Sequence, residues 1–222
     1  MKKALTLIYI LLVALALQAQ NTMFQTGGLN ISINNKGYIS SLTVCDKNIL
    51  SDSSYPILMG CHNGRLALPQ AFEPSYGTLY NVIFDDGGEA VLDIQELGSH
   101  LKITIERQNI HGGDYDAMII CPVMLNINEV VGDIIGVVQG KGVAFGIQAL
   151  NIKTNAGIPQ EYARKINERL HYEGEPASVS TSSLPAYRLS ATRTKKGAMM
   201  QFSARYRGRL EYRNVQGVDS VM

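Results

Sequence analysis

Short stretches of alternating polar and apolar residues, separated every 8–12 residues by glycine, asparagine or aspartate, constrain this chain most. A polar–apolar period of two is typical of a strand with one face in a core, and glycine and asparagine supply the positive φ of tight turns. The clearest strands are expected at residues 30–34, 79–84, 90–95 and 101–106. About a dozen such strands predict a mainly β protein, an antiparallel β-sandwich.

The stretch Val130–Ile152 is rich in β-branched residues and is interrupted by Gly140-Lys141-Gly142. Glycines at such a break allow a hairpin turn, so we expect a central hairpin with both faces buried. One helix is expected, at residues 159–170. Pro159 suits a first turn there, and apolar residues recur at helical spacing at Tyr162, Ile166 and Leu170.

Two other segments are expected to depart from regular strands. The apolar run Tyr115–Ile127 contains Pro122, which predicts an edge strand or a bulge because proline cannot donate to a sheet ladder. The segment Phe72–Tyr80 contains Pro74 and Gly77, and we expect it to be irregular.

The first residues have the composition of an export signal. Lys2 and Lys3 precede an apolar run at residues 5–17, and Ala19 offers a small residue for cleavage. The run is too short to be a good membrane span. We therefore expect residues 1–19 to be removed, leaving a protein without a membrane span that is periplasmic, attached to the cell surface or secreted.

The remaining chain is long enough for one large β domain or two small ones. We place a β-sandwich domain at residues 28–172 and a Gly/Pro/Ser-rich linker at residues 173–185. Further strands are expected at residues 186–222, as the start of another domain or as a truncated end. The net charge of +1 gives no argument for a nucleic-acid partner, and none is expected.

The chain holds three cysteines, Cys45, Cys61 and Cys121. In an oxidising compartment this odd count allows one disulfide or none. Cys45 and Cys121 lie in apolar runs, where cysteine usually behaves as a small hydrophobe, so we expect buried free thiols. No C-x-x-C or H-x-H spacing occurs, and we expect neither a metal site nor another cofactor.

Two polar segments are candidates for chemistry. The segment Asp85–Glu89 offers oxygen ligands for calcium but lacks the alternating spacing of a calcium loop, so we expect a hairpin turn. The segment His111–Asp116 holds an imidazole and two carboxylates, which could do general acid–base work. Catalytic carboxylates usually come from different elements, and no nucleophile motif, phosphate loop or dinucleotide fingerprint occurs. No catalytic residue is assigned.

An aromatic segment is the first candidate for ligand binding. Its rings could stack on the apolar face of a sugar, with Glu73 and Arg65 as hydrogen-bonding partners, or could cover one end of the core. These rings belong to Phe72, Tyr76 and Tyr80.

A row of arginines is the second candidate. Residues 201–213 alternate, so that one face of the expected strand carries Arg205, Arg207 and Arg209. Such a row suits the carboxylates or sulfates of an acidic glycan, or it is a charged face that keeps an edge strand from aggregating.

The segment Ile33–Leu42, followed by Asn48-Ile49-Leu50 and Pro56-Ile57-Leu58, resembles the opening of galactose-mutarotase-like super-sandwich domains. The resemblance covers residues 28–170 and implies an all-β fold of the kind that often precedes the catalytic domain of exported bacterial glycosidases. The catalytic His and Glu of true mutarotases cannot be placed on any motif here. The resemblance therefore implies a non-catalytic domain that contacts glycan or supports its binding. Two alternatives stay open, a cell-surface structural or adhesin-like module with protein partners and a glycoside hydrolase in its own right.

Overall fold

The computed structural model describes residues 21–51, 55–111, 113–131 and 137–150, together with six strands that lie further along the chain at 154–156, 158–159, 179–180, 190–193, 198–205 and 219–221. In these residues the chain is mainly β, as predicted, and all strand pairs but one are antiparallel. The described part holds no helix that is long and apolar enough to cross a membrane.

The N-terminal sheet has four strands in the order β1-β2-β3-β4. Their bounds are β1 (Thr22–Thr26), β2 (Leu29–Ile33), β3 (Ile39–Val44) and β4 (Lys47–Asn48). The strand expected at residues 30–34 is confirmed as β2, with bounds one residue earlier. One face of this sheet is apolar and buried, with Phe24, Ile31 and Leu42 in register across β1, β2 and β3.

A second sheet has six strands in the order β15-β21-β10-β9-β8-β7. Their bounds are β7 (Pro69–Pro74), β8 (Leu79–Phe84), β9 (Glu89–Leu97), β10 (His100–Asn109), β15 (Gln148–Ala149) and β21 (Asp219–Val221). The strand predicted at residues 79–84 has the predicted bounds, and Asp85–Gly88 forms the predicted hairpin turn, with Gly87 at φ 82°.

A third sheet is formed by β16-β20-β11-β5-β6, with β19 paired to β20. Their bounds are β5 (Leu58–His62), β6 (Arg65–Ala67), β11 (Ala117–Leu125), β16 (Thr154–Ala156), β19 (Ser190–Arg193) and β20 (Ala198–Arg205). Every residue of β11 is buried. The predicted bulge at Pro122 is confirmed, because the pairing with β20 shifts register between Ile120 and Val123. An edge position for this strand was the wrong alternative, since β11 lies between β20 and β5.

The predicted hairpin at Gly140–Gly142 is confirmed. It joins β13 (Val137–Gly140) to β14 (Val143–Gly146) in a small sheet with β12 (Val130–Val131), and its two turn residues, Lys141 and Gly142, have φ 53° and 72°. Burial on both faces was a wrong prediction. Val138 and Phe145 are buried but Gln139 and Ala144 are exposed, because only one face of the small sheet packs on the core.

The expected helix lies mostly outside the described residues. Pro159 belongs to β17 (Ile158–Pro159), which pairs in parallel with β18 (Val179–Ser180), and residues 160–170 are not described. The C-terminal strands pair with strands from much earlier in the chain, β20 with β11 and β21 with β10.

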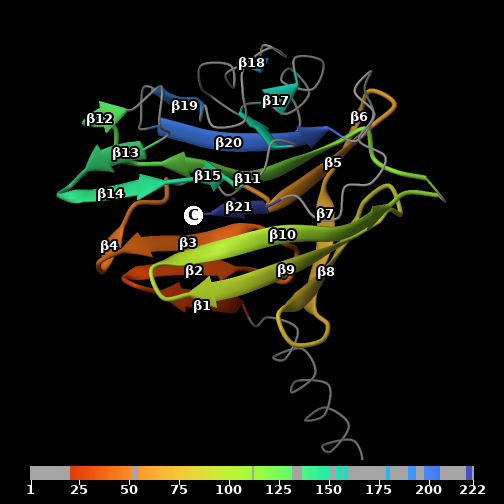
Figure 1. The fold of residues 1–222 in the computed structure, drawn as a ribbon, viewed down its shortest axis with the longest axis horizontal. Coiled ribbons are helices and arrows are strands. Elements are labelled where there is room, and N and C mark those ends of the chain that lie inside the picture. Colours follow the sequence, from red (N-terminus) through yellow and green to blue (C-terminus); the bar gives the residue numbers. More distant parts are fainter. Residues whose placement is uncertain are drawn as a thin grey trace, which may run out of the picture.

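One apolar core joins the sheets. In Figure 1 the sheet of β11 and β20 lies above and the sheet of β9 and β10 below, with β1, β2 and β3 beside the latter. Side chains from all of these layers meet in a single cluster that includes Phe24, Ile31, Leu92, Ile103 and Ile120. Burying an apolar side chain of this size stabilises the fold by about 1.5–3 kcal/mol.

The strand β7 forms one end of its sheet and pairs only with β8 (Figure 1). The prediction that Phe72–Tyr80 is irregular was wrong at the two ends of the segment, which belong to β7 and β8, while residues 75–78 form the turn between them. Pro74 is compatible with β7 because proline is tolerated on an edge strand whose N–H groups need no partner strand. On the outer side of β7 the N–H of Phe72 donates to the carbonyl of Asn35 at 2.7 Å. Pro74, two residues further on, points to the same side and has no N–H.

All three cysteines are thiols. Cys61 and Cys121 are buried, as predicted for Cys121. The prediction that Cys45 is buried was wrong. Cys45 occupies a two-residue turn between β3 and β4 at φ 47°, and this turn projects beyond the apolar run that precedes it.

Candidate functional site

A groove of about 460 Å³ lies where three separate parts of the chain meet. The turn between β2 and β3 forms one wall, the start of β7 forms the floor, and the turn between β8 and β9 forms the opposite wall. The lining residues are Lys36, Tyr38, Leu68, Pro69, Gln70 and Asp85. Its volume falls within the range of roughly 300–1,000 Å³ that is usual for small-molecule sites.

The first wall is fixed by Asn34. Its side-chain oxygen accepts hydrogen bonds from the N–H groups of Lys36 and Tyr38, both at 3.0 Å. Asparagine is favoured at such a position because its short amide can bond the backbone two residues on. Gly37 follows at φ 85°, and a Cβ there would lie 3.2 Å from the Cβ of Pro69. The turn therefore packs closely against the floor, and Lys36 and Tyr38 are held at its edge.

The opposite wall is fixed by two hydrogen bonds between Asp85 and Leu68. The Asp85 carboxylate accepts from the N–H of Leu68 at 3.0 Å, and the Asp85 N–H donates to the Leu68 carbonyl at 2.9 Å. This pair joins the turn between β8 and β9 to the residue that precedes β7. The carboxylate of Asp85 thus has a defined place at the groove although the residue is exposed.

The lining combines polar groups of opposite character with apolar surface. Lys36 presents only donors, Asp85 presents only acceptors, and Gln70 presents both. Leu68, Pro69 and the ring of Tyr38 contribute apolar surface. A concave site with a few polar groups around an apolar floor is suited to a small amphipathic ligand.

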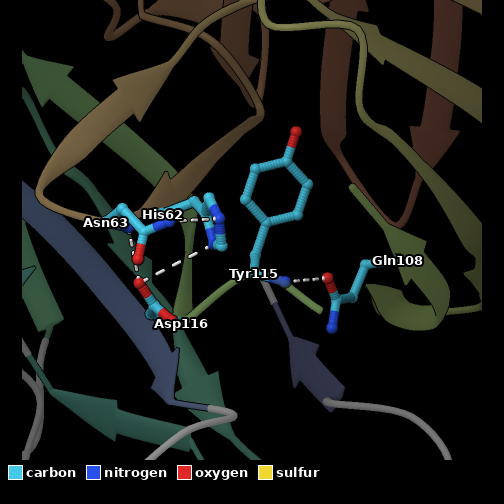
Figure 2. Close-up of polar contacts among 5 residues, drawn as sticks. All are labelled: His62, Asn63, Gln108, Tyr115 and Asp116. Atoms are coloured by element: carbon cyan, nitrogen blue, oxygen red, sulfur yellow. Dashed lines mark hydrogen bonds and ion pairs between the residues drawn. The ribbon is translucent and has the colours of Figure 1, made fainter. Parts of the chain in front are cut away.

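A second polar cluster lies at the turn between β5 and β6 (Figure 2). The Asp116 carboxylate accepts from the N–H of Asn63 at 2.7 Å and lies 3.8 Å from Nδ1 of His62. That Nδ1 atom is buried and has no hydrogen-bond partner. The other ring nitrogen, Nε2, lies 2.7 Å from the side-chain amide nitrogen of Asn63. Asn63 and Gly64, at φ 47° and 69°, supply the tight turn that brings His62 and Asn63 to Asp116.

The cluster of His62, Asn63 and Asp116 ties this turn to the start of β11. Both ring nitrogens of His62 face neighbours within the cluster, and none of the three residues lines the groove. The arrangement holds the turn between β5 and β6 against the start of β11. It was missed from the sequence because 53 residues separate Asn63 from Asp116, and their pairing depends on the alignment of β5 with β11.

Tyr115 stands next to this cluster and is fully buried. Figure 2 shows its ring edge-on to His62, with a centroid separation of 6.4 Å, and its N–H donates to the side chain of Gln108 at 2.6 Å. The hydroxyl donates to Asp86 Oδ1 at 2.8 Å, and the N–H of Gly88 donates to the same oxygen at 3.0 Å. Burial raises the pKa of the Tyr115 phenol, and the hydrogen bond to Asp86 raises it further.

The aromatic candidates are placed in two different environments. Phe72 is buried and its ring stacks on that of Tyr80, with centroids 5.0 Å apart and planes 2° apart. Tyr80 also meets Phe24 edge-on at 5.3 Å, and burial raises the pKa of Tyr80, with a smaller contribution from Glu96. Tyr76, in the turn between β7 and β8, is 85 % exposed. Only Tyr76 presents its ring to solvent, and the role of all three in ligand binding stays a prediction.

The arginine row falls largely outside the described residues. Arg205 ends β20, where it is in register with Ala117 of β11, while Arg207 and Arg209 are not described. The row stays a prediction.

The acidic segments take part in local bonding. Asp85 and Asp86 bond backbone and Tyr115, as described above, and Asp116 bonds Asn63, whereas His111 and Asp114 are exposed. Within the described residues no group of three or more His, Cys, Asp or Glu side chains could hold a metal ion.

The groove itself was not predicted. Its residues come from segments around positions 36, 69 and 85, and only the folded sheets bring them together. One local signal was present, since Asn34-Asn35-Lys36-Gly37 marks a turn, but nothing in the sequence indicated that Asp85 lies opposite it.

No protein-family model matches this chain, and neither curated proteins nor solved structures give a match.

Proposed function

We propose that the protein is an exported, non-catalytic β-sandwich domain that contacts a glycan, and that the groove between Lys36 and Asp85 is the contact site. The observation that carries this proposal is the amphipathic lining of the groove, in which donors, acceptors and apolar surface face one concave space.

A sugar ring matches this lining in kind. It has a rim of hydroxyl groups, which both donate and accept hydrogen bonds, and a face of C–H groups that packs on an aromatic or proline ring. Lys36 and Gln70 supply donors, Asp85 and Gln70 supply acceptors, and Tyr38 and Pro69 supply the apolar contact.

The non-catalytic part of the proposal rests on the carboxylates. Most glycoside hydrolases place a pair of Asp or Glu residues on either side of the scissile bond. The lining of the groove contains a single carboxylate, that of Asp85. Its bond to the Leu68 N–H gives it a positional role, which favours binding over hydrolysis.

The super-sandwich architecture and the export of the protein are parts of the same proposal. Antiparallel sheets that share one core support the architecture. The basic and apolar character of residues 2–17, followed by Ala19, supports export.

Binding of the purified protein to a glycan array tests the proposal. A signal that falls at least tenfold in Gln70→Ala and in Tyr38→Ala places the glycan in the groove. Tyr76→Ala is the matched control, because it removes an exposed ring from outside the groove. Circular dichroism checks that each variant keeps its strands.

Other outcomes contradict the proposal. A signal lost only in Tyr76→Ala would move the site to the aromatic turn. Absence of any glycan signal would favour a structural module with protein partners, and turnover of aryl-glycosides would overturn the non-catalytic assignment.

A further inference from the structure

We propose that the groove selects a neutral sugar, recognised through its hydroxyl groups, over an acidic one. This inference rests on the proposed function and names the ligand class of the same site. It follows from the charges at the groove and from how firmly each of them is held.

The lining residues carry one positive and one negative charge, those of Lys36 and Asp85. A carboxylate on the ligand would be attracted by Lys36 and repelled by Asp85. Because both charges line one open groove, neither attraction nor repulsion dominates at a distance comparable to the Debye length of about 8–10 Å. The described lining gives an anion no net electrostatic gain.

The two charged side chains differ in how they are fixed. The carboxylate of Asp85 accepts from Leu68, and its own N–H donates back to Leu68, so its position is set before any ligand arrives. Lys36 is fixed through its backbone N–H, which donates to Asn34, while the residue is exposed. A preorganised acceptor loses less conformational entropy on binding than a long, exposed side chain does.

The fixed carboxylate of Asp85 therefore determines which class of ligand the groove prefers. A hydroxyl donating to a carboxylate makes a charge-assisted hydrogen bond, about twice as strong as a neutral one. An exposed pair between Lys36 and a ligand carboxylate would contribute little, since surface ion pairs are typically worth about 0–1 kcal/mol. Hydroxyls on the ligand serve all three polar side chains, because they donate to Asp85 and accept from Lys36 and Gln70.

This preference belongs to the groove and not to the predicted arginine row. Among the described residues the one cation that lines the groove is Lys36, so an acidic polymer held by the predicted row would be tested as a separate binding event. The salt dependence of binding distinguishes the row from the groove, because salt screens the attraction between exposed charges but not hydrogen bonding to a neutral sugar.

The experiment uses an array of paired oligosaccharides that end in galactose or galacturonate, and in glucose or glucuronate. The purified protein is applied at low and at high ionic strength. We expect retention on the neutral member of a pair to exceed retention on its acidic partner, with little change between the two salt concentrations.

Two variants sharpen the test. Asp85→Asn keeps an oxygen for the Leu68 N–H but removes the charge, and it should weaken binding of the neutral glycan about tenfold. Glu106→Gln is the matched control. It removes an exposed carboxylate from β10 outside the groove and should change nothing. Urea denaturation of both variants checks that the fold is retained.

Each result decides between the claims. Stronger, salt-sensitive binding of the acidic member would overturn the inference and leave the proposed glycan function standing. Unchanged binding of the neutral glycan by Asp85→Asn would also overturn it. Binding of neither member would overturn the proposed function, and this inference with it.

Discussion

Tyr115 stabilises the turn that carries the acidic wall of the groove. Its ring fills space that glycine leaves open, because a Cβ at Gly60 or Gly88 would clash with the Tyr115 side chain. Its hydroxyl then reaches Asp86, the residue next to Asp85. A single buried side chain just before β11 thus supports a turn that lies 29 residues earlier in the chain.

Replacing Tyr115 by phenylalanine keeps the ring and removes the hydrogen bond to Asp86. We expect the free energy of unfolding at neutral pH to fall by about 1–2 kcal/mol, since bonds to charged groups are stronger than average and Asp86 is only half-buried. Urea denaturation measures the loss. Tyr76→Phe, at a tyrosine that is 85 % exposed, is the control and should have no effect.

Tyr115 also limits the stability of the fold at alkaline pH. Burial, aided by Asp86, raises the pKa of Tyr115 in the folded protein above the value of about 10 that it has in the unfolded chain. The folded state therefore holds this proton more tightly, so its contribution to stability is complete below pH 10 and is lost as the pH rises further. Between pH 8 and 12 the free energy of unfolding, measured from denaturation curves, should fall more steeply with pH for the natural protein than for Tyr115→Phe. Equal slopes for the two proteins would contradict this assignment.

The three thiols should differ in reactivity. Cys45 is exposed, whereas Cys61 and Cys121 are buried, and burial also raises the pKa of the Cys121 thiol, which disfavours the reactive thiolate. We expect an alkylating reagent to modify one cysteine in the folded protein and all three in denaturant without reductant, as read by mass. Modification of one cysteine in denaturant would reveal a disulfide.

Tight hairpin turns recur among the elements of this fold. Two-residue turns with positive φ at both positions occur at Cys45-Asp46, Asn63-Gly64 and Lys141-Gly142. This is the pattern of type I′ turns, for which Asn-Gly is the preferred sequence. Cys45-Asp46 departs furthest from that preference, since neither residue is glycine or asparagine.

Changing Cys45 to asparagine and Asp46 to glycine together should therefore stabilise the protein. Cysteine has neither the freedom of glycine nor the short polar side chain by which asparagine and aspartate tolerate the left-handed region, where an L-residue loses about 1 kcal/mol. We therefore expect a gain of about 1 kcal/mol in the free energy of unfolding, most of it from the change at Cys45. The midpoint of thermal unfolding measures it. The reverse substitution of Asn63-Gly64 by Cys-Asp should produce a loss of similar size, and a gain there would contradict the argument.

The strands that the sequence predicted well are those with one wet face. In residues 101–106 the buried Leu101, Ile103 and Ile105 alternate with the half-buried Lys102 and the exposed Glu106, although Thr104 is buried beside β21. In residues 79–84 Val82 and Phe84 are buried and Ile83 is exposed. Residues 72–74 were not predicted as a strand, since Pro74 is compatible with a strand only at the edge of a sheet. Whether a strand lies at an edge depends on the whole sheet, which no local pattern contains.

Non-local contacts also explain why the groove and the His62 cluster escaped prediction. Lys36 and Asp85 face one space because Gly37 packs on Pro69 and Asp85 bonds Leu68, two contacts between distant segments. Turn residues were recognised at both places, from asparagine and glycine around Lys36 and from aspartate and glycine at Asp85. Which distant segments contact these turns depends on the order of the strands in the folded sheets.

The molecule as a whole has a core that crosses its sheets. The main cluster takes residues from β1, β2, β3, β5, β6, β7, β8, β9, β10, β11, β13 and β14. Since these strands share buried neighbours, we expect the described part of the chain to unfold in one cooperative step. Urea transitions followed by circular dichroism and by tyrosine fluorescence should coincide. Two separated transitions would show that the sheets are independent units.

The outer edge of β7 bears on whether copies of the protein can polymerise through this sheet. A bare strand edge is a template on which a second chain can add a strand and start a fibril. Here the Asn35 carbonyl already takes the Phe72 N–H, and Pro74 has none to offer, so an incoming strand would find no regular ladder of donors. This side of the sheet is therefore closed to polymerisation, and neighbouring molecules can lie edge to edge there without fusing.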